Sequence, residues 1–331
     1  MIRSCLLRGL TTASLLAALG SAALAAEKVT FMLDWLPAGD KAVPYLALQK
    51  GLFAAEGLEV TLQIGRGSSD VVTKLATGVA DIGTGGLAAL LQAKAQSTVP
   101  VKAILSVYTE QPDAIFTSEG SGITSLKDVS GKKLATATFS SSNVVWPLLL
   151  QTNGIDMSKV DVLKVDPGAL APMLAAGQVA ATINWSTVAP LFSKALAEGG
   201  KKLVVIPWSQ YGFEGYGLSV FASEKALKER PEVVRKFLKA YAKASEMAIA
   251  DPKSAADALK TMVPEVDVGV AERQFVASVP LIVNAISKKD GPGAFEPKLL
   301  AVTWEWTAKS QNIPLDKIDP ETAVDRSFIP K

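Results

Sequence analysis

The sequence contains no histidine, and its only cysteine is Cys5, near the N-terminus. Without these side chains, the usual zinc sites, the Ser-His and Cys-His nucleophile pairs and imidazole acid-base steps cannot be built. No disulfide framework can hold the chain, so its stability must come from buried apolar surface. The chain also lacks a phosphate-binding P-loop, a dinucleotide-binding fingerprint and a nucleophile elbow. An enzyme that relies on carboxylates alone remains an alternative.

The first 25 residues have the pattern of a secretory signal peptide. Arg3 and Arg8 precede an apolar run that ends at Leu24, and residues 23–25 have the small-x-small form of a signal-peptidase site. We therefore expect this segment to be removed and the mature protein to be periplasmic. Cys5 precedes the apolar run, so it cannot carry the lipid of a bacterial lipoprotein. No later stretch offers about 20 uninterrupted apolar residues, the length that spans a bilayer.

The chain also lacks an excess of positive or negative charge. The chain has 34 basic and 32 acidic side chains, and loss of the two arginines of the signal peptide balances them. This balance predicts neither nucleic acid nor a membrane surface as a partner. The remaining chain of roughly 300 residues exceeds what one hydrophobic core usually covers, which favours two lobes. We expect a monomer that binds a small molecule and has no cofactor.

The chain alternates strand-like and helix-like segments, which is typical of a parallel sheet covered by helices. Strand-like segments are predicted at 28–35, 57–64, 79–83, 99–108, 132–139, 159–165, 178–185 and 214–223. Helix-like segments are predicted at 41–53 with a helix stop at Gly51, and at 67–78, 140–154, 168–177, 186–200 and 231–250, with a further helix opening after Gly86. The predicted fold class is therefore α/β.

The order of these segments predicts two doubly wound lobes joined by two crossings. The crossings are expected near 111–117 and 214–221, so one lobe would contain residues 26–114 and 218–331 and the other residues 115–217. Two crossings make a hinge. The cleft between such lobes, at the carboxyl ends of the strands, is the expected position of a ligand.

Several stretches resemble one family. "LDWLPAGDKAVPYLALQKGLFAAEGLEVTL" (33–62) and "GSSDVVTKLATGVADIGTGG" (67–86), with "ITSLKDVSGKKLA" and "RPEVVRKFLKAY" further on, are similar to one group of periplasmic solute-binding proteins of ABC importers. This group serves nitrate, sulfonates, taurine and thiamine pyrimidine precursors. The resemblance implies a type II periplasmic-binding-protein fold that closes over a small molecule and docks on a membrane permease.

The sequence departs from the pyrimidine-precursor relatives in one loop. It reads "GDKA" at 39–42, where those relatives carry a loop with asparagine and histidine. The eukaryotic pyrimidine synthases related to this fold use a histidine and a cysteine cluster, and this chain has neither. The resemblance therefore favours a binding protein over an enzyme.

The loop after the first strand supplies the first candidate ligand contacts. Trp35 matches the Asp-Trp pair of the family and offers a flat ring at the mouth of the cleft, unless it only packs between strand and helix. Asp34 could bind ligand or cap nearby amides. Asp40 and Lys41 could bind ligand, or serve as a helix N-cap and a solvated charge. Tyr45, one turn further on, could direct its hydroxyl into the cleft.

Three further segments supply candidates. Gly83, Thr84 and Gly85 are expected to present exposed backbone amides at a helix start, or to form a plain tight turn. At the return crossing, Glu214 and Tyr216 could contact ligand or pack in the hinge.

In the second lobe, five polar and aromatic residues follow strands. Ser140, Ser141 and Ser142 are expected at a helix N-terminus. Asn184 and Trp185 are expected in the loop equivalent to 83–86. An amide, an indole and hydroxyls facing Trp35 suit a flat, polar, nitrogen-bearing or aromatic solute. A small oxyanion held on helix N-termini is the alternative.

Overall fold

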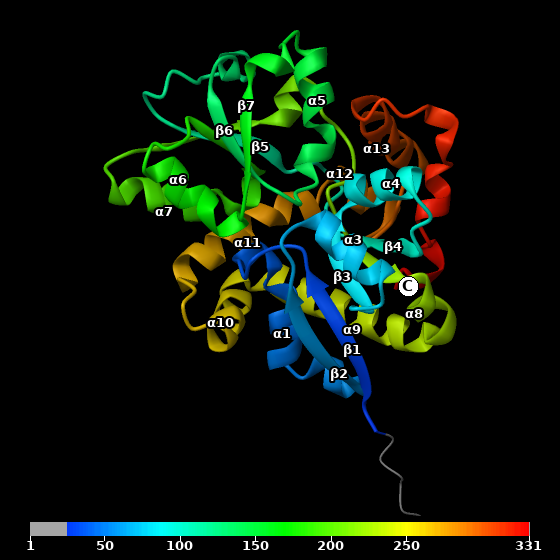
Figure 1. Cartoon of the computed structure of the whole chain (residues 1–331). Helices are drawn as coiled ribbons and strands as arrows, with labels where there is room; N and C mark the ends of the chain where they lie inside the picture. The colour runs from blue at the N-terminus through cyan, green and yellow to red at the C-terminus, as the bar shows by residue number, and fades with distance from the viewer. Residues whose placement is uncertain (1–24, 331) are drawn as a thin grey trace, which may run out of the picture.

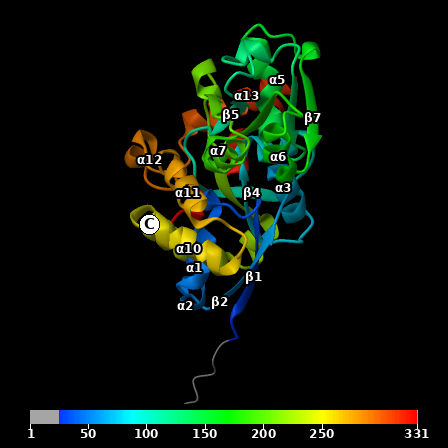
Figure 2. The same ribbon diagram turned by 90° about the vertical axis from the view of Figure 1, so that its left-hand side faces the viewer.

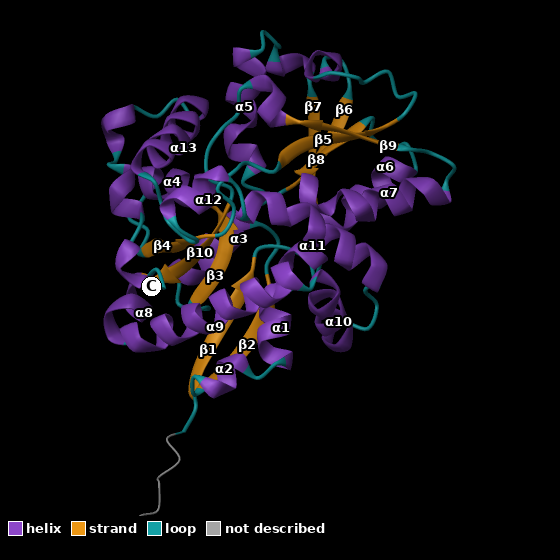
Figure 3. Ribbon diagram, turned by 180° about the vertical axis from the view of Figure 1, so that it is seen from behind, coloured by secondary structure: helices purple, strands orange, loops and turns teal. Residues whose placement is uncertain are grey.

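The computed structural model describes residues 25–330, which form two lobes, each built on a five-stranded sheet covered by helices (Figures 1 and 3). The predicted α/β fold class is confirmed. The predicted signal peptide lies outside the described residues, apart from Ala25. Within the described part of the chain, every helix is too short or too polar to cross a membrane.

The first sheet has the strand order β2-β1-β3-β10-β4. β1, β2 and β3 are parallel, whereas β10 runs antiparallel to both of its neighbours. Its strands are β1 (Glu27–Leu33), β2 (Leu58–Ile64), β3 (Ile82–Gly86), β4 (Val101–Ser106) and β10 (Leu218–Ser223). The chain therefore returns to this sheet after completing the second one.

The second sheet repeats the pattern with the order β7-β6-β8-β5-β9. Here β6, β7 and β8 are parallel, and β5 is the antiparallel strand. Its strands are β5 (Asp113–Ser118), β6 (Lys133–Ala137), β7 (Asp161–Val165), β8 (Ala181–Trp185) and β9 (Leu203–Pro207). The lobe boundary predicted at residue 114 falls inside β5. The lobe boundaries at 114 and 217 stay a prediction.

Helices cover both faces of each sheet. In the first lobe and the C-terminal region they are α1 (Val43–Gln49), α2 (Leu52–Ala55), α3 (Ser68–Ala76), α4 (Leu87–Gln96), α8 (Glu224–Glu229), α9 (Pro231–Ala250), α10 (Pro252–Met262), α11 (Val268–Ile282), α12 (Ala285–Asp290) and α13 (Pro297–Ser310). In the second lobe they are α5 (Ser142–Thr152), α6 (Leu170–Ala175) and α7 (Ala189–Glu198), and short 3-10 turns such as η1 (Gly39–Lys41) and η5 (Ser186–Val188) complete the fold.

Successive residues of the central strands point to opposite faces and enter separate cores, as strand geometry requires. Phe31 packs with Phe237 of α9 at 4.9 Å between ring centroids, and Phe53 stacks on the same ring at 5.0 Å. Met32 packs instead among residues of α3, α4 and α13. The apolar stripe predicted for 231–250 is confirmed, since α9 buries Phe237 and Tyr241 in this core.

The structure corrects the predicted element map in two places. Both sheets are mixed rather than parallel, because β10 and β5 enter from the crossings with reversed direction. β5 and β9 were not predicted; β5 is almost wholly buried and therefore lacks the alternation that marks a strand. The helix stop predicted at Gly51 is confirmed, since its φ of 67° is left-handed and it separates α1 from α2.

Both lobes direct the carboxyl ends of their parallel strands toward each other. β1 leads into the loop at 34–41, β3 into α4, β6 into the loop at 138–141 and β8 into η5. Elements of the first lobe and the C-terminal region also touch the second lobe, because α13 packs on α5 and α11 on α7 (Figure 2). The residues expected to bind ligand therefore lie where the two lobes meet.

Candidate functional site

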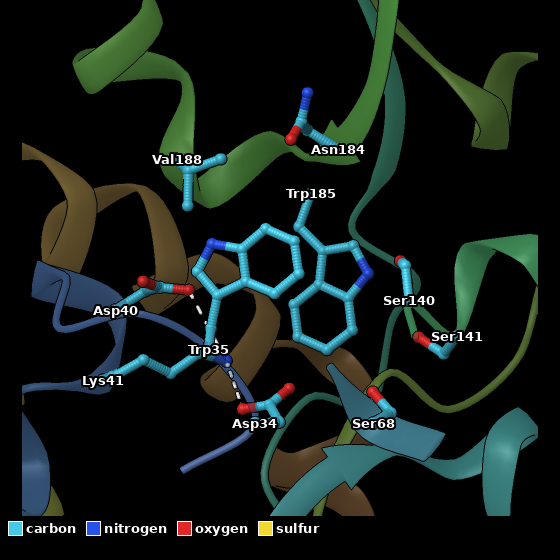
Figure 4. A pocket seen from close by; sticks show the side chains of 10 residues that line it. All are labelled: Asp34, Trp35, Asp40, Lys41, Ser68, Ser140, Ser141, Asn184, Trp185 and Val188. Atoms are coloured by element: carbon cyan, nitrogen blue, oxygen red, sulfur yellow. Dashed lines mark ion pairs between the residues drawn. The ribbon is translucent and has the colours of Figure 1, made fainter. Parts of the chain in front are cut away.

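A cavity between the lobes brings together eight of the fifteen predicted site residues (Figure 4). From the first lobe they are Asp34, Trp35, Asp40 and Lys41, and from the second Ser140, Ser141, Asn184 and Trp185. Ser68 and Val188 complete the lining. The remaining space is about 20 Å³, enough for roughly one water molecule.

Two indole rings occupy the centre of the site. Trp35 follows β1 and Trp185 ends β8, so each lobe contributes one ring, and both are half-buried (Figure 4). Trp185 also lies over the ammonium group of Lys41, whose Nζ is 4.7 Å from the ring centroid. Such rings can bind a flat solute by burying its faces.

Beside the rings lies a buried group of three charges. Lys41 Nζ is 3.1 Å from Asp34 Oδ1 and 3.7 Å from Asp40 Oδ2. The lysine side chain is only 2% exposed, which is exceptional for this residue type. The interpretation of Lys41 as a solvated charge is therefore wrong, because the fold places it between two carboxylates.

Each carboxylate of this group is held by a neighbouring hydroxyl. Thr84 Oγ1 donates to Asp34 Oδ1 at 2.9 Å, and Thr187 Oγ1 donates across the cleft to Asp40 Oδ2 at 2.8 Å. Burial raises the pKa of Asp40, while the positive charge of Lys41 and the bond from Thr187 oppose the rise. Asp40 makes no side-chain cap for the following helix, so its interpretation as an N-cap is wrong.

Three buried polar atoms of this cavity, Asp40 Oδ1, Lys41 Nζ and Asn184 Oδ1, make no hydrogen bond among the described residues, although Lys41 Nζ keeps its ion pairs with Asp34 and Asp40. A buried polar group without a partner is costly, so such atoms are usually satisfied by water or ligand. Two of the three are acceptors. The site can therefore receive N–H or O–H groups from a bound molecule.

The serines at this site have different surroundings. Ser140 and Ser141 line the cavity, whereas the hydroxyl of Ser142 donates to Asp113 at the start of β5. Ser68 was missed as a site residue, although its place at the start of α3, after the strand next to β1, was a usable signal. Val188 carries no polar group, and its apolar side chain gave no signal.

Seven predicted residues do not reach the cavity lining: Thr84 and Ser142, which bond to Asp34 and Asp113, and five others. Tyr45 is buried in the first core, Tyr216 packs on Phe295 with its hydroxyl accepting from the amide of Glu296, and Glu214 is exposed. Gly83 and Gly85 lie inside β3. The expectation of exposed amides there is wrong, because this stretch is buried and paired in the sheet.

Asp113 was missed because its strand was missed, yet it lies beside Trp185 of the site. It is 3% exposed and pairs with Trp185 in the sheet register. Burial raises its pKa from 3.8 to about 7, although hydrogen bonds from the Ser142 hydroxyl and the Trp185 side chain oppose the rise. Folding therefore favours the protonated carboxyl.

We expect Asp113→Asn to change how stability depends on pH. Because the carboxyl is deprotonated in the unfolded chain above about pH 4 but protonated in the folded chain up to about pH 7, wild-type stability should fall as pH rises through this window and level off above it. The shift corresponds to roughly 4 kcal/mol at most. Urea unfolding at several pH values should show the variant gaining stability over wild type across the window. A constant difference between the two proteins would contradict the assignment.

Close contact between the lobes depends on Gly86. A Cβ added there would lie 2.3 Å from Ser141 Oγ and 2.6 Å from its Cβ. The backbone at Gly86, with φ of −69° and ψ of 130°, is one that alanine adopts readily. The constraint therefore comes from the opposite lobe and not from the local conformation.

Gly86→Ala should hold the lobes apart without unfolding either of them. We expect affinity for the solute to fall at least about tenfold, with a melting temperature close to that of wild type and a larger radius of gyration by small-angle scattering at saturating solute. Adding Ser141→Gly should restore closure, with Ser141→Gly alone as the reference. Unaltered scattering and affinity in Gly86→Ala would mean that the lobes do not meet at this point in solution.

The sequence model of the NMT1/THI5-like family matches residues 40–255. The chain belongs to this family. Among curated relatives, the riboflavin-binding protein RibY of Chloroflexus aurantiacus is 26% identical over 312 residues, covering 92% of this chain and 86% of that protein. The 4-amino-5-hydroxymethyl-2-methylpyrimidine phosphate synthase THI13 of Saccharomyces cerevisiae is 28% identical over 242 residues, 70% of each chain.

Solved structures with the same fold include periplasmic binding proteins. The alkanesulfonate-binding protein SsuA of Xanthomonas axonopodis pv. citri, bound to MOPS, gives a TM-score of 0.69 at 19% identity and covers 90% of this chain and 98% of its own. A protein of Bordetella bronchiseptica RB50 gives 0.73 at 20% identity, with coverage of 91% and 95%. For this NMT1/THI5-like chain, these likenesses confirm the predicted type II periplasmic-binding-protein fold.

Proposed function

We propose that this protein is the extracytoplasmic solute-binding component of an ABC importer and that it captures a small planar nitrogen-bearing solute between its lobes. The observation that carries the proposal is the pairing of Trp35 and Trp185 from opposite lobes beside unpartnered buried acceptors on Asp40 and Asn184. The rings suit the flat faces of a heterocycle, and the acceptors suit its amino or ring N–H groups. The protein would work as a periplasmic monomer that delivers its solute to a membrane permease.

The charges of the site support this choice over an oxyanion. Lys41 is the only cation that lines the cavity among the described residues, and it lies between Asp34 and Asp40. One positive charge faces two carboxyl groups, so the site is neutral if Asp40 is protonated and negative if it is not. A sulfonate or nitrate would have to approach this pair of carboxylates without a free cation to bind it.

The relatives agree with a planar ligand. Riboflavin, in the name of the Chloroflexus relative, and the pyrimidine, in the names of the yeast relatives, are both flat nitrogen heterocycles. The alkanesulfonate-binding structure supports the fold alone, at 19% identity. We therefore rank a heterocycle above a sulfonate as the solute.

The synthase relatives raise a second candidate function, an enzyme of pyrimidine synthesis. The sequence argues against it, since no histidine is present and the only cysteine, Cys5, lies in the predicted signal peptide. Incubating the protein with bound solute and analysing the solute by mass spectrometry separates the two functions. A binding protein returns its solute unchanged, whereas conversion to a product would favour the enzyme.

Calorimetric titration with a small panel tests the proposed ligand class. The panel contains riboflavin, 4-amino-5-hydroxymethyl-2-methylpyrimidine, taurine and an alkanesulfonate, the first two being heterocycles taken from the names of the relatives. We expect a heterocycle to bind and both sulfonates to fail. Binding of a sulfonate with no heterocycle bound would reject the proposal. Native mass spectrometry of the protein purified from its periplasmic fraction gives an independent identification of the solute.

A further inference from the structure

A second, larger concavity adjoins the site on the far side of Trp35. It encloses about 510 Å³, within the range of ordinary small-molecule pockets, whereas the inner cavity has room for roughly one water molecule. Trp35, Asn184 and Val188 line both spaces. The outer groove and the inner cavity are therefore two parts of one cleft, with the Trp35 ring between them.

The walls of the outer groove are largely apolar and come from both lobes. The first lobe contributes the loop after Trp35 and the start of α11, and the second contributes η4 (Pro167–Ala169), α6 and α7. The apolar lining includes Leu36, Pro37, Val270, Ala171, Phe192 and Ala195. A molecule in this groove would contact both lobes and would favour the closed arrangement through burial of its apolar surface.

Charged side chains lie among the groove residues and are mostly negative. Lys194 and Asp267 pair across the two lobes at 2.8 Å, and both side chains are nearly half-exposed. Glu198 and Glu265 add two further carboxylates. One cation against three carboxylates disfavours a phosphate, sulfonate or carboxylate group in this groove.

We propose that the outer groove is the second half of the ligand site and that the solute is bipartite, with a planar nitrogen-bearing head and an uncharged, apolar arm. The proposal rests on the proposed function, whose head group it retains. Because the inner cavity in this arrangement holds only about 20 Å³, the head would enter while the lobes are further apart. It would then lie against Trp35, with its N–H groups toward the unpartnered oxygens of Asp40 and Asn184. The arm would extend past the ring edge into the groove over α6 and α7.

A matched series of probes tests this division. Each probe has the same aminopyrimidine head, which carries a methyl group, a pentyl arm or a carboxypentyl arm. We expect the pentyl probe to bind at least about tenfold more tightly than the methyl probe, because the added methylene groups leave water. The carboxypentyl probe should lose this gain, since its carboxylate would meet the acidic side chains of the groove.

Two variants of α7 test whether the arm of the solute lies in the outer groove. Ala195→Trp narrows the groove, whereas Ala197→Trp, on the same helix, places the same ring at an exposed position outside the groove lining. The gain from the pentyl arm should disappear in Ala195→Trp and persist in Ala197→Trp. The methyl probe should bind wild type and both variants alike. Melting temperatures close to that of wild type would show that both variants fold.

The outcomes separate the two proposals. If the methyl probe binds but the pentyl arm adds nothing, or if its gain survives Ala195→Trp, the bipartite site is overturned and the proposed function stands. A gain shared equally by the carboxypentyl arm would overturn the uncharged character of the arm. If no heterocyclic head binds while a sulfonate does, both proposals are overturned.

Discussion

Replacing Lys41 with methionine is expected to lower the free energy of unfolding by roughly 3–5 kcal/mol. The ammonium group lies 3.1 Å from Asp34 and 3.7 Å from Asp40, and all three side chains are almost completely buried. Methionine keeps most of the length of the side chain but leaves two carboxylates facing each other without a cation. Urea unfolding followed by circular dichroism measures the effect.

An exposed lysine provides the control for this substitution. Lys243 is 62% exposed and pairs with Glu246 at 3.3 Å, so Lys243→Met should change stability by less than about 0.5 kcal/mol. Combining Lys41→Met with Asp34→Asn and Asp40→Asn should recover part of the loss, because the unpaired charges are then gone. If Lys41→Met unfolds at the same urea concentration as wild type, the ammonium group of Lys41 does not stabilise the two buried carboxylates.

Replacing Trp35 with alanine is expected to weaken binding of a planar solute by about 2–4 kcal/mol, or roughly 30- to 700-fold in affinity. The ring lines both the inner cavity and the outer groove, so its loss removes the wall against which a flat ligand would be buried. Calorimetric titration with the heterocycle that binds most tightly measures the change. Trp35→Phe should lose much less affinity, since it retains an aromatic face.

The same titrations separate a planar solute from an oxyanion. Trp306 of α13 packs on Phe213 and lines neither the cavity nor the groove, so it provides the control. Trp306→Ala should leave affinity unchanged. Affinity for a planar solute should also vary little over a roughly tenfold rise in ionic strength. A Trp35→Ala protein with wild-type affinity, together with strongly salt-sensitive binding, would reject the preferred ligand class.

Local sequence patterns were sufficient to predict much of the architecture. The 3.6-residue stripe of α9 and the alternation of β2 follow from which side chains must leave water, and both are visible in the chain without its fold. The carboxyl ends of predicted strands also located Trp35, Asn184 and Trp185 in the cavity, because loops at those ends meet in open α/β sheets. The family resemblance in 33–62 and 67–86 supplied the two-lobed fold.

Which charged side chains are buried, and with which partners, could be known only from the tertiary structure. Nothing in "AGDKA" distinguishes a solvated lysine from one enclosed by two carboxylates, since Asp34 and Thr187 reach the segment through the fold. Asp113 was hidden because a strand buried on both faces loses its alternating pattern. The sequence by itself determined most of the helices and strands, the two-lobe plan and the positions of Trp35 and Trp185 in the cleft. The tertiary structure decided the charge balance, the close contact at Gly86 and the outer groove, because each depends on residues that are distant in the chain and adjacent only after the lobes have packed.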